Sequence, residues 1–201
     1  AAVVVPLAAD GAVDVGLLDV AVRYALAHQI LAHASGGRLP GGFQEGMARL
    51  VMPPSTNTQT GVAALRAAFD RGALVQWADL AGPGSAYLKP DISYPQSLSI
   101  AVFLVGHVGF DCLPDLATAT AGDVAFRSAF DTACGEPLEV AEATWLAWLP
   151  GYVDGGWRDH PLFSPDLGLA RQLFAEGADA RAAALLRAIV AVNAAGSAAD
   201  G

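Results

Sequence analysis

The segment from Tyr24 to Leu50 constrains the fold of this chain more than any other stretch, because it encodes two helices joined by a short connection. The first helix is apolar and carries His28, and the Gly-Gly pair at 36–37 is typical of a helix end. A second helix follows, with Glu45 near its start. We therefore expect two neighbouring helices, one carrying His28 and the other Glu45.

The first of these helices is predicted to run over residues 15–34. Asp14 suits the N-cap position, because a short acidic side chain can accept hydrogen bonds from the free N–H groups of the first turn. Residues at helical spacing then define one face of the helix: Leu17, Leu18, Ala21, Ala25, His28 and Ala32. This face is expected to pack on the rest of the domain.

The layout of the two helices resembles the core of the gluzincin metallopeptidases, the peptidase MA-like group. In that family one helix carries His-Glu-x-x-His, which supplies two zinc ligands and a general base. A following Pro-x-Trp-x-x-Glu-Gly-x-Ala helix supplies a glutamate as the third ligand. Leu39-Pro40 and the run from Glu45 to Ala48 match this second helix well. The first helix matches the family pattern only in part.

The resemblance extends over residues 17–149. Ala73 to Leu80, with Trp77 as its large anchor, is similar to a family connector, and Tyr94-Pro95-Gln96-Ser97 is similar to the start of a family helix. The resemblance implies a mainly α fold: a gluzincin-like helical domain, like the C-terminal domain of thermolysin, over residues 1–150. A minimal strand remnant is expected at Val3 to Leu7.

Helix boundaries in the middle of this domain follow from local signals. Ser55 to Thr60 is polar and is predicted to be a loop, followed by an amphipathic helix over residues 61–71. Pro95 suits the first position of a further helix. The last helix of the resemblance is expected to begin at Pro137 and to carry Glu142, Trp145 and Trp148.

Two alignments of the first helix with the zinc motif remain open. In one, His28 is the first histidine, Gln29 takes the place of the catalytic glutamate and Ala32 that of the second histidine. In the other, Tyr24 takes the place of the first histidine, Ala25 that of the glutamate, and His28 is the second histidine. In both alignments one histidine and the general base are missing.

This loss bears directly on catalysis. A carboxamide such as that of Gln29 can hold a water molecule but accepts no proton near neutral pH. Zinc in such sites needs three protein ligands, and the resemblance leaves His28 and Glu45 as a vestigial pair. His33 lies about 140° from His28 around a helix axis, so it can join the pair only if the helix breaks. His107 and Asp159 are the other available donors, and the cleft residues implied are Tyr24, Ala32 and Tyr94.

The charge of the chain argues against two classes of partner. The net charge is −9, from 11 basic and 20 acidic residues, and Lys89 is the only lysine. An acidic chain without a basic cluster is not suited to nucleic acid or to an anionic membrane surface. No apolar run reaches the roughly 18 residues that a membrane span needs. The degenerate zinc motif of the resemblance leads instead to the expectation of an unidentified protein partner and no cofactor, with weakly bound zinc as the alternative.

The two cysteines, Cys112 and Cys134, have none of the spacings typical of metal or redox motifs. The even count suits one disulfide or two buried thiols. The resemblance favours the disulfide, because relatives are commonly exported and Cys134 stands where the family usually has phenylalanine. It would join two helices, and it implies a location outside the cell or in the cell envelope.

The C-terminal part is expected to form a separate unit. Residues 151–164 are rich in Gly, Trp and Asp and are predicted to be a linker on the surface. Residues 165–196 resemble one helical hairpin of the tetratricopeptide type. Because a single repeat cannot bury its own apolar face, the hairpin is expected to dock on the main domain or to begin an array.

Three functions follow as hypotheses. The first is a catalytically inactive metallopeptidase-like domain that acts as a binding or scaffold module outside the cytoplasm. The second is a divergent zinc-dependent metallopeptidase with a non-standard ligand set, and the third is a helical protein-interaction module.

Overall fold

The structure is a computed structural model, and it describes residues 15–82, 89–162, 174–180, 182–183 and 186–187. Over these residues the secondary structure is helical, and the described chain contains no strand. This confirms the prediction of a mainly α protein. The predicted strand at 3–7 and most of the predicted hairpin at 165–196 lie outside the described residues.

The elements follow one another with short connections. They are α1 (Val15–Ala34), α2 (Gly41–Leu50), α3 (Thr56–Asp70), α4 (Trp77–Leu80), α5 (Pro90–His107), α6 (Cys112–Ala119), α7 (Phe126–Cys134), α8 (Leu138–Val153) and the 3-10 helix η2 (Gly156–Arg158).

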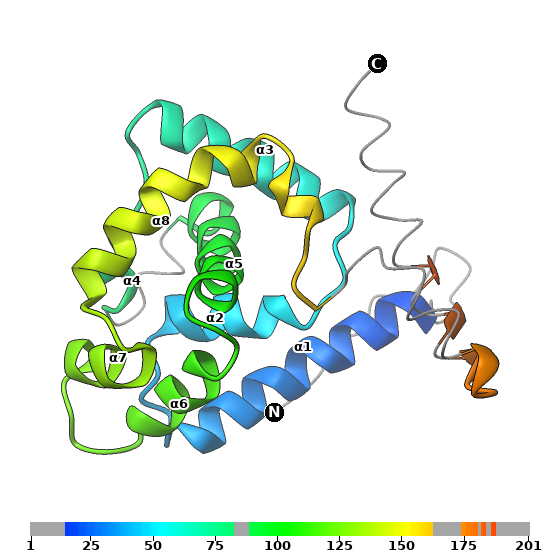
Figure 1. Ribbon diagram of the computed structural model, residues 1–201, viewed down its shortest axis with the longest axis horizontal. Coiled ribbons are helices and arrows are strands. Elements are labelled where there is room, and N and C mark those ends of the chain that lie inside the picture. The colour runs from blue at the N-terminus through cyan, green and yellow to red at the C-terminus, as the bar shows by residue number, and fades with distance from the viewer. Residues whose placement is uncertain (1–14, 83–88, 163–173, 181, 184–185, 188–201) are drawn as a thin grey trace.

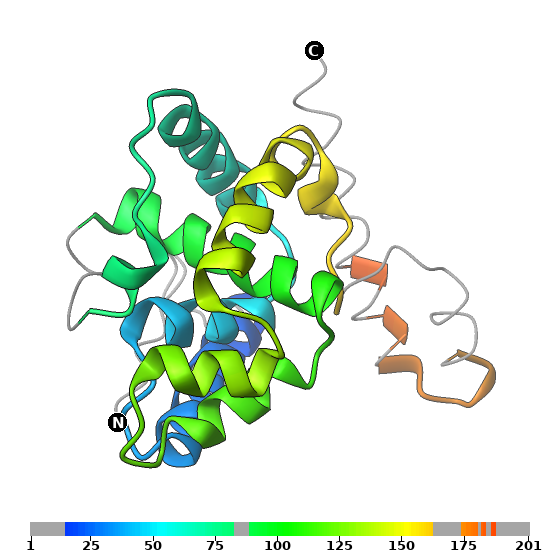
Figure 2. The ribbon, with the colours of Figure 1, turned by 60° about the vertical axis from the view of Figure 1, so that its left-hand side comes forward.

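Helix α5 is the central element. Figure 1 looks almost along its axis, with α2, α3, α6 and α8 around it, and each of these helices contacts it. The reason lies in its sequence: the run Ile100 to Leu104 is apolar on all sides and fully buried. Figure 2 shows α3 (teal) and α8 (yellow) side by side at the end of the molecule away from α6 and α7.

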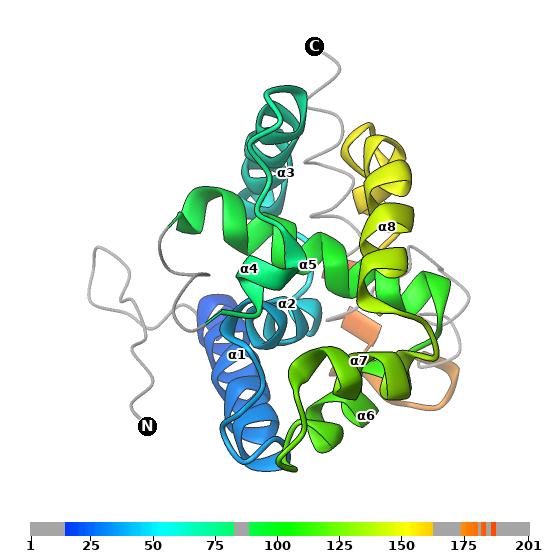
Figure 3. The same cartoon turned by 90° about the vertical axis from the view of Figure 1, so that its left-hand side faces the viewer.

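Helix α2 lies between α5 and α1, as Figure 3 shows. Gly46 permits the close crossing with α5: a Cβ atom there would lie 2.1 Å from the carbonyl oxygen of Ser97. No side chain can occupy that space without moving one of the two helices. α2 is therefore held directly on the core, and its other face is turned to α1.

Trp77 anchors the core from α4, as predicted. Its ring is fully buried, with centroids 5.7 Å from Trp145 and 5.9 Å from Phe43. The carboxylate of Glu142 accepts a hydrogen bond from the Trp77 backbone N–H at 2.9 Å. Large aromatic side chains contribute much of the buried apolar area of a small domain, so this cluster fixes α4 against α8.

The connection before α4 is held by one side chain of α5. Gln96 is fully buried and accepts a hydrogen bond from the Val75 N–H at 3.0 Å. It also donates one to the Val75 carbonyl at 2.5 Å. The amide thus satisfies both backbone groups of Val75 and holds the connection before α4 on α5.

Two helix starts differ from the prediction. α3 begins at Thr56, so the predicted loop at 55–60 is wrong, because Ser55 and Thr58 form a capping box that satisfies the free N–H groups there. α5 begins at Pro90, which takes the first position of the helix, and Pro95 lies inside it.

The end of the predicted main domain also differs. α8 continues through Pro150 to Val153, and Tyr152, Val153 and Trp157 are buried. The segment 151–164 was predicted to be a surface linker, and its described part, residues 151–162, contributes side chains to the core. The linker prediction relied on the content of Gly, Trp and Asp, but large aromatic side chains such as Trp157 are buried.

Cys112 and Cys134 form a disulfide that joins the start of α6 to the end of α7. This confirms the predicted pairing. Gly135 follows at φ 74°, a left-handed conformation that ends α7 and suits glycine.

Within the described residues, no single helix has both the length and the hydropathy to cross a membrane. One pair, α5 with α6, meets the composition criterion together, but it is bent by 116°.

Candidate functional site

Glu45 is the most unusual residue of the fold, because its side chain is charged and only 1% exposed. The short helix α2 turns Phe43, Met47 and Leu50 into the core, and Glu45 lies at the α1 side of the same helix. A carboxylate without partners would be very unfavourable in such a place. The arrangement around Glu45 is therefore the first candidate for a functional site.

Both carboxylate oxygens of Glu45 are engaged. The hydroxyl of Tyr24, from α1, donates a hydrogen bond to Oε2 at 2.7 Å. Nε of Arg49, one turn further along α2, donates to Oε1 at 2.5 Å. The Arg49 side chain is 28% exposed, so this ion pair connects the buried carboxylate to the surface of the protein. Hydrogen bonds to an ionised acceptor are stronger than neutral ones.

His28 lies on α1 one turn after Tyr24, and its Nε2 is 3.4 Å from Oε2 of Glu45. The two atoms are close, but the angles do not meet those of a hydrogen bond. The ring of His28 meets the ring of Tyr24 edge-on, with centroids 4.5 Å apart. Residues four apart on a helix share a face, which is why Tyr24 and His28 both reach the same carboxylate.

Gln44 favours one tautomer of His28. Its Nε2 lies 3.3 Å from the His28 carbonyl oxygen, which can only accept, so this atom is the amide nitrogen. The same nitrogen lies 3.1 Å from Nδ1 of the ring and donates to it. Nδ1 of a neutral imidazole is then the acceptor, and Nε2 carries the proton that faces Glu45.

Tyr94, from α5, contacts this cluster through Arg49. The guanidinium carbon of Arg49 lies 4.5 Å from the centre of the Tyr94 ring and 5.9 Å from that of Tyr24. Stacking between two aromatic rings suits the flat guanidinium and holds it over Glu45. We refer below to Tyr24, His28, Glu45, Arg49 and Tyr94 as the Glu45 cluster.

The electrostatics follow from these contacts. Burial raises the pKa of Glu45, but the contacts with His28, Tyr24 and Arg49 together outweigh it, and the pKa lies below its ordinary value. Burial, together with the hydrogen bond to Glu45 and its negative charge, raises the pKa of Tyr24. Glu45 is therefore ionised and Tyr24 protonated at neutral pH.

The cluster does not suit zinc as it stands. Zinc binds an imidazole nitrogen that carries no proton, so binding at Nε2 of His28 would need the other tautomer, which the contact with Gln44 disfavours. The oxygens of Glu45 are occupied by Tyr24 and Arg49. Nowhere in the described part of the chain do three or more His, Cys, Asp or Glu residues gather in a way that could hold a metal ion. What the arrangement does is fasten α1 to α2 and α5.

The structure brings together four of the residues predicted for this site: Tyr24, His28, Glu45 and Tyr94. Ala25 and Ala32 are half-buried on α1, and Gln29 is exposed. A residue at position 29 is turned about 100° from His28, which directs it to solvent.

The other potential donors lie elsewhere. His33 and Asp159 are exposed. His107, at the end of α5, lies 3.0 Å from Oε1 of Glu136 and stacks on Phe103 with centroids 4.9 Å apart. None of these three residues is therefore part of the Glu45 cluster.

Two residues at this site were not predicted: Arg49 of the Glu45 cluster, and Gln44, which contacts His28 beside it. Arg49 lies four residues after Glu45, the spacing at which opposite charges meet on a helix, so the sequence did contain a signal for it. The sequence contained no signal for Gln44, because its contact with His28 depends on how α1 crosses α2.

Comparison with known proteins gives no neighbour for this chain: no protein-family model, no curated protein and no solved structure matches it.

Proposed function

We propose that this chain is a catalytically inactive, gluzincin-like domain that acts as a binding or scaffold module outside the cytoplasm. The observation that carries the proposal is the Glu45 cluster. His28 and Glu45 face each other from two successive helices, as two ligands of a peptidase would, but Tyr24 and Arg49 occupy the carboxylate.

The contacts support one of the two alignments with the zinc motif. Tyr24 and His28 reach Glu45 together, which suits the alignment that puts Tyr24 in place of the first histidine. Ala25 then takes the place of the general base, and a methyl group cannot accept a proton. In this alignment the metal and its activated water are replaced by a tyrosine hydroxyl and a guanidinium.

The disulfide supports the proposed location. Structural disulfides persist in oxidising compartments and are rare in a reducing cytosol. Both sulfurs of the Cys112–Cys134 pair are buried, which suits a structural role better than a redox one.

A binding role is favoured over catalysis by one face of α1. Val22, Leu26 and Ile30 are spaced by four residues and are 46%, 56% and 58% exposed. They form an apolar stripe on the face of the helix that is not packed on α2. Single exposed apolar residues are ordinary, whereas a continuous stripe is typical of a contact surface.

Bound-metal analysis tests the proposal. Protein purified without chelator is expected to carry far less than one zinc per chain and to leave casein uncleaved. One zinc per chain, lost in His28→Asn but retained in His107→Asn, would favour a divergent metallopeptidase instead. The exposed His107 serves as the control, because it lies outside the cluster.

A further inference from the structure

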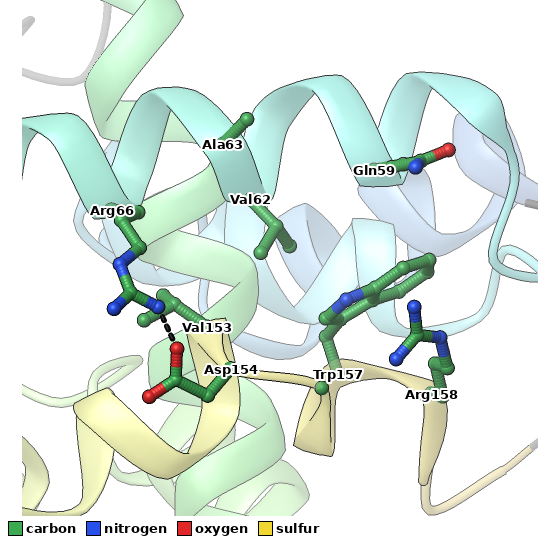
Figure 4. Close-up of a pocket in the computed structure, with 9 residues that line it drawn as sticks. Gln59, Val62, Ala63, Arg66, Val153, Asp154, Trp157 and Arg158 are labelled. Atoms are coloured by element: carbon green, nitrogen blue, oxygen red, sulfur yellow. Dashed lines mark ion pairs between the residues drawn. The ribbon is translucent and has the colours of Figure 1, made fainter. Parts of the chain in front are cut away.

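A second site lies on the other side of the molecule's core from α1, between α3 and the segment that follows α8. A pocket of about 390 Å³ opens there. Figure 4 shows Val62 of α3 and Val153 of α8 at its middle, with polar side chains at both ends. A mainly apolar concavity with a few converging polar groups is the usual form of a site for a small ligand.

The two ends of the pocket differ in charge. At one end Arg66 forms an ion pair with Asp154, so the charges there compensate each other. At the other end the guanidinium of Arg158 lies 5.1 Å from the centre of the Trp157 ring. Arg158 has no carboxylate within ion-pair distance in the described part of the chain, and its Nε is buried without a hydrogen-bond partner.

The Arg158 end of the pocket is therefore suited to bind an anion. The indole of Trp157 holds the guanidinium in place, so little side-chain freedom is lost when a ligand binds. Gln59 of α3 lines the pocket at this end and offers a further amide N–H. A planar guanidinium matches the two oxygens of a carboxylate, and an amide from the same pocket lining can add a donor.

We infer that this pocket binds a small organic carboxylate, with the carboxylate on Arg158 and Gln59 and an apolar body over Val62, Val153 and Trp157. A fully charged phosphate fits less well, because the pocket lining holds two guanidinium groups and one of them is already paired with Asp154. The chain as a whole is strongly acidic, so an unpaired cation in a concave site is a specific feature and not part of a general positive field.

The test is calorimetric titration of the whole chain at neutral pH with 4-phenylbutyrate and with its neutral analogue, 4-phenylbutanamide. Saturable binding of the acid is expected, and the amide should bind at least about tenfold more weakly. An N-acetylated dipeptide ending in phenylalanine forms a third arm, which distinguishes a free acid from a peptide C-terminus as the source of the carboxylate. Equal binding of acid and amide, or no saturable binding of either carboxylate, would overturn the inference. This comparison uses the unaltered protein.

Variants locate the site. Arg158→Gln should lower the affinity for 4-phenylbutyrate at least about tenfold. Arg158→Lys should retain part of the affinity, because lysine keeps the positive charge but cannot bind both carboxylate oxygens as a guanidinium does. Arg127→Gln is the matched control: Arg127 is exposed, pairs with Glu139 and does not line the pocket, so affinity should not change. Loss of affinity in Arg127→Gln equal to that in Arg158→Gln would contradict the assignment. Inorganic phosphate should not compete, and competition at similar concentrations would argue against a carboxylate site.

Discussion

Tyr24 of α1 donates its hydroxyl hydrogen to Glu45 of α2 across 2.7 Å, and this bond joins two helices at a charge that is almost completely buried. Its energetic importance can be measured with a change of one atom. Tyr24→Phe keeps the ring against His28 but leaves Glu45 with one donor fewer. We expect the free energy of unfolding to fall by about 1.5–3 kcal/mol, the range for a hydrogen bond to a charged group.

The measurement is urea unfolding at neutral pH, with Arg23→Ala as the control. Arg23 forms an ion pair with Asp19 on the same helix, but both side chains are about half exposed. Such a pair contributes about 1 kcal/mol at most. A loss in Tyr24→Phe no larger than in Arg23→Ala would show that the buried bond is not what holds α1 on α2.

The stabilisation by Glu45 is expected to depend on pH. Its pKa in the fold lies below the ordinary value of 4.5, so the unfolded chain takes up a proton at higher pH than the folded one. The stability that ionised Glu45 provides is therefore fully present above about pH 4.5 and is lost as the pH falls through the folded pKa. Unfolding of the parent chain and of Glu45→Gln should differ most at neutral pH and converge in acid.

The difference between these two proteins is the informative quantity. Burial lowers the pKa of His160 to about 4, so His160 also reduces stability as the pH falls from its ordinary pKa of 6.5 toward 4. This contribution is common to both proteins and cancels. A difference in unfolding free energy that stays constant from pH 7 to pH 3 would contradict the ionised, engaged state of Glu45.

Substitution of two leucines tests whether the apolar stripe on α1 is a contact surface or part of the core. Leu65 of α3 is 0% exposed, whereas Leu26 of α1 is 56% exposed. Leu65→Ala should cost about 2–5 kcal/mol, because it removes buried methyl groups and leaves a cavity. Leu26→Ala should change stability by about 0.5 kcal/mol or less. A large loss in Leu26→Ala, measured by urea unfolding, would mean that the stripe on α1 is packed within the chain and is not a surface for a partner.

The disulfide should stabilise the α6–α7 pair. The bonded cysteines are 22 residues apart, and closing a loop of that size contributes roughly 3 kcal/mol in the chain-entropy model. Cys112→Ala with Cys134→Ala is therefore expected to lower the free energy of unfolding by about that amount, without loss of helical circular dichroism in water. Two titratable thiols in the unreduced, unfolded parent protein would refute the pairing.

The sequence predicted those features that depend on local pattern. The span of α1, its end at the Gly-Gly pair and the burial of Trp77 follow from spacing and residue size. The proximity of His28 and Glu45 was expected from the resemblance, which makes them ligands on two successive helices.

The missed features depend on competition between local and tertiary effects. The start of α3 was missed because Ser55 and Thr58 read as loop residues, although the same hydroxyl groups also cap a helix. The pocket beside Trp157 could not be predicted, since it forms only where the chain after α8 returns to α3. To predict that Tyr24 and Arg49 engage the Glu45 carboxylate, one would need the crossing angle of α1 and α2. The periodicity of the sequence does not contain that angle.

Zinc affinity of two reconstructed variants tests the central claim most directly. Tyr24→His with Ala25→Glu restores the motif in the alignment that the Glu45 contacts support, and it also removes the tyrosine that occupies the carboxylate. Gln29→Glu with Ala32→His restores the other alignment and serves as the matched control. We predict that the first pair gains at least about a hundredfold in zinc affinity over the parent chain, or roughly 2.7 kcal/mol, and that the second does not. A gain by the second pair alone, or by neither, would show that α1 and α2 are not disposed as in the gluzincin peptidases.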